Sequence, residues 1–451
     1  MGVLFGTDGV RGIANVELTP ERAFALGRAG SYVLARRSSG ERPRILVGKD
    51  TRISGDMLEA ALMAGICSTG ADVLTVGVIP TPAVAYLTQK YQASCGIVIS
   101  ASHNPVEDNG IKFFGPGGYK LPDEVEAEIE ELVLAGVDGL PRPSGKDVGQ
   151  VYDVKEALNN YISYLTGCYT LPQDLNGLRI VIDCANGASY EAGPELFTRL
   201  GARVIPINNV PNGVNINERC GSTNTESLRQ AVIEQQADLG IAYDGDADRC
   251  IVIDEQGQEL DGDHIMVICA LDMQRRGVLQ PARVVATVMS NIGLDIALRR
   301  ENVVVDSCKV GDRYVLEKMQ ETGAIIGGEQ SGHIIFLQHA TTGDGLLTSV
   351  KLVEVMKRTG MRLSQLAQEM KKYPQKLVNV RLDNKEEILN HPLVLAALQE
   401  AEQKLGEKGK LVVRPSGTEP LVRLMAQGPQ EQILEEVIAQ IQEAIQTAQQ
   451  N

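Results

Sequence analysis

Short apolar runs alternate with longer segments of helical composition along most of this chain. The runs at 44–49, 178–183 and 282–288 are rich in aliphatic, often β-branched residues, which is typical of strands. Each run leads through a polar loop to a helix, expected at about 55–69, 189–200 and 291–300, and then to a second strand at 72–76, 203–207 and 302–305. The order of strand, helix and strand predicts a parallel unit in each of three repeats.

Each repeat continues into a second unit, in which two short strands flank a polar loop. These strand pairs are expected at 95–99 and 111–114, at 239–242 and 250–254, and at 324–326 and 334–336. Because the three loops hold equivalent positions, we expect three similar mixed α/β domains in tandem, each turning one functional loop toward a shared central cleft.

The last part of the chain has a different pattern, with strands at 377–382 and 410–413 and a final helix from about Gln430. It predicts a smaller α+β C-terminal domain. Linkers are expected in the Pro/Gly-rich stretch 136–145 and near Tyr373. The expected domains are 1–150, 151–255, 256–373 and 374–451.

Composition and charge narrow the class of protein. The chain has 451 residues, 43% hydrophobic and 22% charged, which fits a globular enzyme of several domains. Its formal charge of −15 argues against a nucleic-acid partner, so an anionic substrate would need a local cationic pocket. With no long apolar run and no basic leader, we expect a cytoplasmic protein without membrane contact. Eight scattered cysteines without a C-x-x-C pair predict buried thiols.

The stretch Ser100–Pro105 places the hydroxyl of Ser102 in a turn directly after an apolar run. An isolated serine in such a turn usually caps it through its own hydroxyl. Here Lys112 follows on the returning strand, where its ammonium can reach the same loop. We therefore interpret Ser102 as a phosphate carrier, to which the neighbouring His103 alone adds little support.

Asp244, Asp246 and Asp248 place three carboxylates at alternate positions. With Glu255 they also fit a calcium-binding helix–loop–helix, but Arg249 stands where its sharp turn needs glycine, and the flanking runs predict strands. Oxygens around one Mg²⁺ are only about 3 Å apart, so the segment must curl. Three crowded carboxylates repel one another without a cation, which favours a Mg²⁺ site with positions left for water and a phosphate oxygen.

Three further motifs are less specific individually. Phe5–Gly12 is glycine-rich but is neither a dinucleotide fingerprint nor a P-loop, and alone it predicts a flexible turn. The stretch Gly328–His333 fits a tight hairpin equally well. Arg414–Pro420 offers a cation, hydroxyls and a glycine, the groups that wrap a phosphate. Together with the Ser102 and aspartate loops, these motifs indicate phosphoryl transfer.

In order and over essentially the whole chain, the five motifs resemble those of the α-D-phosphohexomutase superfamily. The first motif and the Gly328–His333 loop most resemble bacterial members that interconvert glucosamine 6-phosphate and glucosamine 1-phosphate for cell-wall amino-sugar nucleotide synthesis. The resemblance implies a four-domain fold around a central site, a phosphoserine enzyme and a 1,6-bisphosphate intermediate. It also implies Mg²⁺ as cofactor and a hexosamine or hexose 1,6-bisphosphate as activator.

The resemblance further implies a role for each candidate residue. Ser102 would be the phosphoserine, and one of its phosphate oxygens would complete the metal site of the three aspartates. Arg11 and Lys112 would do the general acid and base work, with His103 beside them. Substrate would be bound by a larger set: Glu329, Ser331 and His333 at the sugar, Arg249 at the phosphoryl group, and Arg414, Ser416, Gly417, Thr418 and Arg423 at the other phosphate.

The four domains would then carry, in chain order, the phosphoserine loop, the metal loop, the sugar-binding loop and the distal phosphate site. Two alternatives stay open. One is a related mutase for mannose or glucose phosphates, and the other is a non-catalytic protein that binds a metal or an anion. The expected partner is a small-molecule sugar phosphate, with a homodimer left open.

Overall fold

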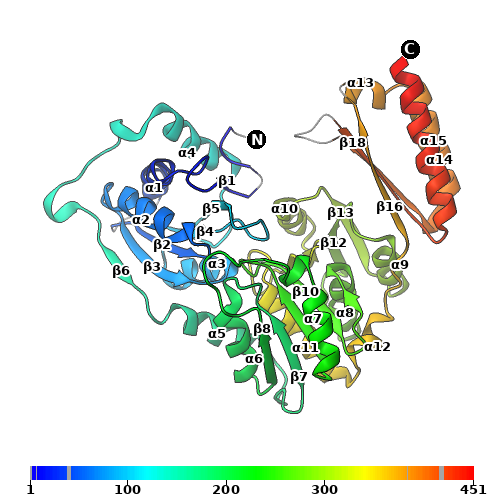
Figure 1. Cartoon of the computed structure of the whole chain (residues 1–451), viewed down its shortest axis with the longest axis horizontal. Helices are drawn as coiled ribbons and strands as arrows, with labels where there is room; N and C mark the ends of the chain where they lie inside the picture. The colour runs from blue at the N-terminus through cyan, green and yellow to red at the C-terminus, as the bar shows by residue number, and fades with distance from the viewer. Residues whose placement is uncertain (1–2, 7, 38–41, 383, 416–420, 451) are drawn as a thin grey trace.

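The computed structural model describes residues 3–6, 8–37, 42–382, 384–415 and 421–450. Four separate sheets follow one another in chain order. Figure 1 shows them along an arc, from the first domain on the left to the fourth on the right. Three mixed α/β domains and a smaller α+β domain confirm the expected fold class.

The first sheet has six strands in the order β1-β5-β4-β2-β3-β6. They are β1 (Val10–Ile13), β2 (Arg44–Lys49), β3 (Asp72–Val78), β4 (Cys95–Ile99), β5 (Asp108–Phe114) and β6 (Val151–Asp153), with helices α1 (Pro20–Ala35), α2 (Ser54–Cys67), α3 (Thr81–Lys90) and α4 (Asp123–Ala135). Strand β6 extends this sheet just past the boundary expected at residue 150.

Strand β1 corrects one sequence-based interpretation. The segment around Gly9 is not only a flexible turn, because Val10–Ile13 pairs antiparallel with β5. Gly9 has φ +78, and a Cβ there would lie 2.4 Å from Ile111 O. The glycine therefore allows the N-terminal segment to lie against the returning strand of the Ser102 loop.

The second sheet has the order β11-β10-β9-β7-β8, and the third has the order β13-β12-β14-β15. The second contains β7 (Arg179–Asp183), β8 (Arg203–Ile207), β9 (Leu239–Tyr243), β10 (Cys250–Asp254) and β11 (Glu259–Leu260), with α5 (Ala157–Cys168), α6 (Ser189–Arg199) and α7 (Glu226–Glu234). The third contains β12 (Arg283–Thr287), β13 (Val304–Cys308), β14 (Ile326–Gly328) and β15 (Ile334–Phe336), with α8 (Gly262–Arg275), α9 (Ile292–Arg300), α10 (Asp312–Thr322), α11 (Gly345–Thr359) and α12 (Leu363–Ala367).

The predicted repeat is present in all three domains. The pairs β2–β3, β7–β8 and β12–β13 are parallel, and each is joined through a helix. The pairs β4–β5, β9–β10 and β14–β15 are antiparallel around the three loops. The strand expected at 302–305 begins two residues later, because Asn302 takes a left-handed φ of 58 where the chain leaves α9.

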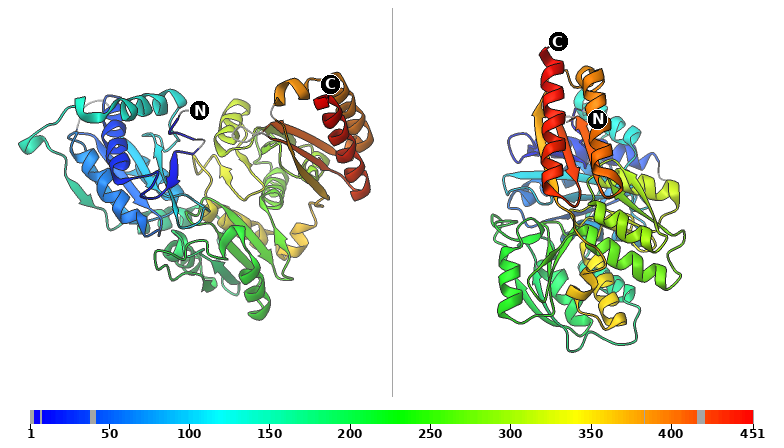
Figure 2. Two further views of the ribbon diagram at one scale, coloured as in Figure 1. Left: turned by 45° about the horizontal axis from the view of Figure 1, so that its top comes forward. Right: turned by 90° about the vertical axis from the view of Figure 1, so that its right-hand side faces the viewer.

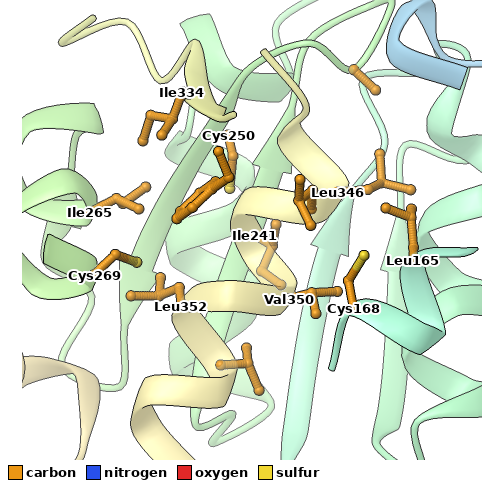
Figure 3. Packing of buried hydrophobic residues seen from close by; sticks show 14 of the residues in the cluster. Leu165, Cys168, Ile241, Cys250, Ile265, Cys269, Ile334, Leu346, Val350 and Leu352 are labelled. Carbon is orange, nitrogen blue, oxygen red and sulfur yellow. The ribbon is translucent and has the colours of Figure 1, made fainter. Parts of the chain in front are cut away.

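The second and third domains share one hydrophobic core. Helix α11 runs through it, and Figure 3 shows its residues Leu346, Val350 and Leu352 between side chains of α5, α8 and the second sheet. The same cluster reaches the first domain through α3. Because this packing is continuous, the loops of the three domains are held in fixed positions relative to one another.

The fourth domain is an antiparallel sheet of order β16-β18-β17 with its own core. It comprises β16 (Gln375–Arg381), β17 (Lys410–Pro415), β18 (Leu421–Gln427), α13 (Lys385–Leu389), α14 (Pro392–Leu405) and α15 (Glu431–Gln450). A short 3₁₀ turn, Gly406–Lys408, joins α14 to β17, and three others lie in the preceding domains at Val137–Gly139, Gly145–Asp147 and Gly221–Thr223. Figure 2 shows that this domain projects beyond the third. There Gln427 Oε1 accepts the backbone N–H of Ile292 at 2.7 Å.

Candidate active site

Loops from three domains line one cavity of about 370 Å³. Its lining includes Asp8, Arg11 and Ser102 from the first domain, Asp248 and Arg249 from the second, and Glu329 and His333 from the third. A larger groove, of about 620 Å³, lies near Leu178 and Met361, away from all of these loops. Predicted functional residues therefore line the smaller cavity, where the three predicted loops meet.

Ser102 follows the carboxyl end of β4 in a left-handed conformation, with φ 53. Its hydroxyl donates to Asp244 Oδ2 at 2.6 Å, and its backbone N–H donates to Ser100 Oγ at 3.0 Å. Nδ1 of His103 lies 3.3 Å from the hydroxyl. Although it lies in a turn, only 1% of Ser102 is exposed, because the metal loop of the second domain covers it.

The aspartate loop curls as its sequence required. One carboxylate oxygen from each of Asp244, Asp246 and Asp248 lies within 4.8 Å of the others, and all three residues are buried. Ala247 takes a left-handed φ of 59, which supplies the bend. The flanking β9 and β10 form an antiparallel pair, so the alternative of a calcium-binding helix–loop–helix is wrong.

Two oxygens of this triad lack a hydrogen-bond partner within the described structure. They are the buried Asp246 Oδ1 and Asp248 Oδ1. A buried carboxylate oxygen without a partner is costly unless a cation satisfies it. Burial, Asp248 and Asp246 together raise the pKa of Asp244 well above its usual value, which reflects the same excess of negative charge. The triad therefore offers the oxygen ligands that a hard divalent cation prefers.

A cluster of cations faces the triad from the first domain. Lys112 Nζ lies 2.8 Å from Asp246 Oδ2 and 2.9 Å from Asp8 Oδ2. Burial alone would lower the pKa of Lys112, but these two carboxylates raise it above its ordinary value. Asp8 also pairs with Arg11 and Lys120. Both cations proposed for acid and base work, Arg11 and Lys112, therefore converge on one carboxylate beside the metal loop.

The third loop is the hairpin between β14 and β15, and it touches the metal loop. Glu329 Oε1 accepts the backbone N–H of Gly311 at 3.0 Å, and Ser331 Oγ has no hydrogen-bond partner among the described residues. His333 Nδ1 lies 3.4 Å from Asp248 Oδ2. Burial alone would lower the pKa of His333, but Asp248 and other carboxylates raise it to about 9. The N–H of Gly343 donates to its Nε2 at 3.0 Å, which opposes protonation.

The structure does not place the fourth domain's residues in the cavity. Arg414 and Arg423 lie directly opposite each other on β17 and β18, and neither lines the cavity. Ser416, Gly417 and Thr418 lie outside the described residues.

Sequence reasoning missed several groups that shape the site. Thr81 Oγ1 donates to Asp246 Oδ2 at 2.7 Å, and Asn217 Nδ2 donates to the carbonyl of Ser102 at 2.9 Å. Arg52 donates to the carbonyl of Ser102, and Asp50 accepts the hydroxyl of Ser100, so both residues hold the same loop. The sequence position of Asp50 and Arg52 could have identified them, because both directly follow the carboxyl end of β2. This end of a strand is the usual site of functional loops in such sheets.

Comparison with known proteins decides the family. Models of the phosphoglucomutase/phosphomannomutase alpha/beta/alpha domains I, II and III match residues 2–137, 159–257 and 261–373, and the C-terminal domain model matches residues 377–444. The chain belongs to the phosphoglucomutase/phosphomannomutase family. This confirms the resemblance to the α-D-phosphohexomutase superfamily and the expectation of an intramolecular phosphotransferase.

Relatives of high identity span the full length of the chain. A phosphoglucosamine mutase of Syntrophomonas wolfei subsp. wolfei is 74% identical over 449 residues, which is 100% of both chains. A phosphoglucosamine mutase of Moorella thermoacetica is 57% identical over 442 residues, 98% of this chain and 99% of that protein.

Solved structures share the fold. A phosphoglucomutase/phosphomannomutase family protein from Burkholderia thailandensis has a TM-score of 0.81 at 24% identity, covering 98% of this chain and 97% of that one. The Aspergillus fumigatus N-acetylphosphoglucosamine mutase, solved with GlcNAc-6P and magnesium, has a TM-score of 0.71 at 18% identity, covering 99% and 96%. In the part of the chain that the structure describes, no helix has the length and apolarity needed to traverse a bilayer.

Proposed function

We propose that this enzyme interconverts glucosamine 6-phosphate and glucosamine 1-phosphate through a phosphoserine and a 1,6-bisphosphate, supplying cell-wall amino-sugar nucleotide synthesis. The observation that carries the proposal is the Ser102 hydroxyl held against a buried triad of aspartates in a cavity lined by three domains. Full-length identity of 74% to a phosphoglucosamine mutase supports the choice of sugar.

In the proposed reaction, phosphorylated Ser102 donates its phosphoryl group to the free hydroxyl of the bound sugar phosphate. The bond from Ser102 Oγ to phosphorus breaks, a bond from the sugar oxygen to phosphorus forms, and the hydroxyl proton passes to a base. The resulting bisphosphate reorients and returns its other phosphate to Ser102, which restores the enzyme. Positioning and neutralisation of charge supply most of the catalysis in such transfers.

Asp244, Asp246 and Asp248 would hold Mg²⁺, with an oxygen of the phosphoserine as a further ligand. The two buried carboxylate oxygens without a hydrogen-bond partner in the described structure, Asp246 Oδ1 and Asp248 Oδ1, support this assignment. When bound, the cation would neutralise the charge of the phosphoryl group beside the triad. Without a cation, about −1.5 to −2 charges on phosphorylated Ser102 would face three further carboxylates.

Lys112 and Arg11 would act as general acid and base, with His103 beside the transferred group. Their shared contact with Asp8 supports this role, because Asp8 lines the cavity. Arg249 would contact the phosphoryl group, and its position in the cavity lining supports this role.

The hairpin residues Glu329, Ser331 and His333 would bind the sugar, and Glu329 would pair with the ammonium group at its 2-position. The fourth domain would hold the phosphate that is not reacting, through Ser416, Gly417, Thr418, Arg414 and Arg423. Arg414 and Arg423 lie directly opposite each other on β17 and β18, and this pairing of two cations supports a phosphate site beside them.

Turnover would also need a source of the first phosphate on Ser102. A hexosamine or hexose 1,6-bisphosphate would load Ser102 at the start of turnover. The partner would be a small-molecule sugar phosphate in the cytoplasm, with a homodimer as the possible assembly. The domains would divide at 1–150, 151–255, 256–373 and 374–451. In this order they would carry the phosphoserine loop, the metal loop, the sugar-binding loop and the distal phosphate site.

A substrate panel tests the proposed function. Turnover of glucosamine 1-phosphate, glucose 1-phosphate and mannose 1-phosphate is measured with Mg²⁺ and a catalytic amount of glucose 1,6-bisphosphate. We expect the amino sugar to have the highest kcat/KM. Faster turnover of mannose phosphate would overturn the sugar assignment. A protein that turns over none of them, and whose intact mass shows no phosphate on Ser102, would be a non-catalytic binder.

A further inference from the structure

The side chain of Arg52, in the loop between β2 and α2, is almost completely enclosed, with 2% of the residue exposed. Its Nε donates to Asp50 Oδ2 at 2.9 Å. Its two terminal nitrogens donate to four backbone carbonyls of the loop after β4: Ser102 at 3.0 Å, Asn104 at 2.8 Å, Asp108 at 3.1 Å and also Pro105. All five N–H donors of the guanidinium therefore have an acceptor.

A second line of hydrogen bonds reaches the same serine from Asp50. The hydroxyl of Ser100 donates to Asp50 Oδ2 at 2.6 Å, and it accepts the backbone N–H of Ser102 at 3.0 Å. Both backbone polar groups of Ser102 are thus linked to the Asp50–Arg52 pair, the carbonyl directly and the N–H through Ser100. Ser102 holds a left-handed φ of 53, a conformation that is unfavourable for a non-glycine residue and persists only where neighbours enforce it.

We propose that Arg52 is a positioning residue for phosphoryl transfer, because it holds the loop of residues 102–108 in the one conformation that points Ser102 Oγ at Asp244. The inference rests on the proposed function, in which Ser102 carries the phosphate. Arg52 does not line the cavity, so it acts through the loop rather than on the substrate. A displacement of about 1 Å at a reacting group can cost about 10²-fold in rate.

Lysine cannot replace this arginine. It has three donors on one nitrogen, and it lacks the planar fork that reaches four carbonyls and a carboxylate together. Arg52→Lys keeps a positive charge beside the buried Asp50, so the carboxylate is not left uncompensated. Asn217 also continues to hold the carbonyls of Ser102 and Asn104, at 2.9 and 3.2 Å. The variant should therefore fold with a loosened loop.

Arg28 is a matched control in the same domain. It is also fully buried, and its guanidinium also donates to backbone carbonyls, those of Val137 and Leu140, and to Ser68 Oγ. Arg28 lies in α1, and the segment 137–140 that it contacts does not line the cavity. Arg28→Lys imposes the same chemical change without touching the Ser102 loop.

The test compares both variants with the wild type by hydrogen-exchange mass spectrometry and by steady-state kinetics with glucosamine 1-phosphate. Arg52→Lys should speed exchange in peptides covering residues 100–109 and lower kcat by on the order of 10²-fold, with KM changed less than about threefold. Arg28→Lys should speed exchange only around residues 137–142 and keep kcat within about threefold of the wild type.

The outcomes separate this inference from the proposed function. Unchanged exchange at 100–109 in Arg52→Lys, or a kcat loss no greater than that of Arg28→Lys, would overturn the positioning role. If the wild type turns over glucose or mannose phosphate instead, the same kinetic comparison is made with that sugar. If the wild type turns over none of the sugars, the proposed function fails and the positioning role for phosphoryl transfer falls with it, whatever the exchange shows.

Discussion

Ser102 Oγ donates a hydrogen bond to Asp244 Oδ2 across 2.6 Å, although the two residues belong to different domains and are 142 positions apart in the chain. The contact joins the proposed phosphate carrier to the proposed metal site. A phosphoryl group on Ser102 would enter this space, so the carrier and the cation must act together.

Ser102→Ala should lower kcat by on the order of 10³-fold or more, because it removes the only atom that can carry the phosphate. The protein should stay folded, since the backbone of Ser102 keeps its hydrogen bonds with Ser100 and Arg52. Steady-state kinetics and intact mass after treatment with glucose 1,6-bisphosphate check this. Ser144→Ala, at an exposed serine of the same domain, should behave as the wild type. A Ser102→Ala enzyme with normal rates would mean that the carrier is another residue.

Asp246→Asn should weaken Mg²⁺ binding and activity together, because it removes one charge from the triad. At a Mg²⁺ concentration 100 times its Kd, the wild type should gain about 2.7 kcal/mol of stability. Thermal unfolding with increasing Mg²⁺ measures this gain as a rise in Tm. The rise should be smaller in Asp246→Asn and unchanged in the exposed control Asp238→Asn. Equal Tm shifts in all three proteins would place the cation elsewhere.

Glu329→Gln should lower kcat/KM for glucosamine phosphate by about tenfold, through loss of a charge-assisted contact with the ammonium group. The glutamine carbonyl can still accept the N–H of Gly311, so the hairpin should keep its shape. Kinetics with glucose phosphate provide the control, because that sugar has no ammonium group. An equal loss with both sugars would assign Glu329 to the sugar hydroxyls instead.

Asp344 should make stability depend on pH. Its Oδ1 caps α11 through the N–H of Leu347, its Oδ2 accepts the hydroxyl of Tyr161, and burial raises its pKa to about 6. For an acid whose folded pKa is raised, the stabilising contribution is complete below about pH 4 and is lost as the pH rises through about 6.

Asp344→Asn cannot ionise, and its one oxygen can still cap α11, since asparagine caps helices as well as aspartate does. Its amide N–H takes the place of Oδ2 and can donate to the hydroxyl oxygen of Tyr161. The Tm of the variant relative to the wild type should therefore rise between pH 4 and pH 7, by the equivalent of roughly 2–3 kcal/mol at most. Thermal unfolding across this range checks it. A pH-independent difference would show that folding does not raise the pKa of Asp344.

Deleting the chain after Tyr373 should leave a folded core that binds Mg²⁺ but turns over substrate at least about 10²-fold more slowly. The fourth domain has its own hydrophobic core, so its removal exposes little of the other three. Ile292 loses the acceptor Gln427 Oε1, a local cost at the junction. The Mg²⁺-dependent shift in Tm and the mutase rate of the truncated protein measure these two properties. Near-normal KM and kcat in the truncated protein would show that the distal phosphate is held elsewhere.

Much of the fold could be predicted because it depends on local pattern. Strands β2, β4 and β10 begin and end where the apolar runs do. Strand β1 could not be predicted, because its glycine-rich sequence has little strand propensity and it forms only by pairing with β5. Strand β13 was misplaced by two residues, because the left-handed turn at Asn302 is not visible in hydrophobicity.

The sequence by itself determined which residues make up the site: a serine, three aspartates and a set of cations on loops after strands. Their order along the chain identifies the family. Only the tertiary structure decided which of them meet. Lys112 reaches Asp246 across 134 positions, and Arg52 holds a loop 50 positions away. Such contacts depend on how domains pack on their shared core, and the packing is set by side-chain shape over distances that no local pattern records.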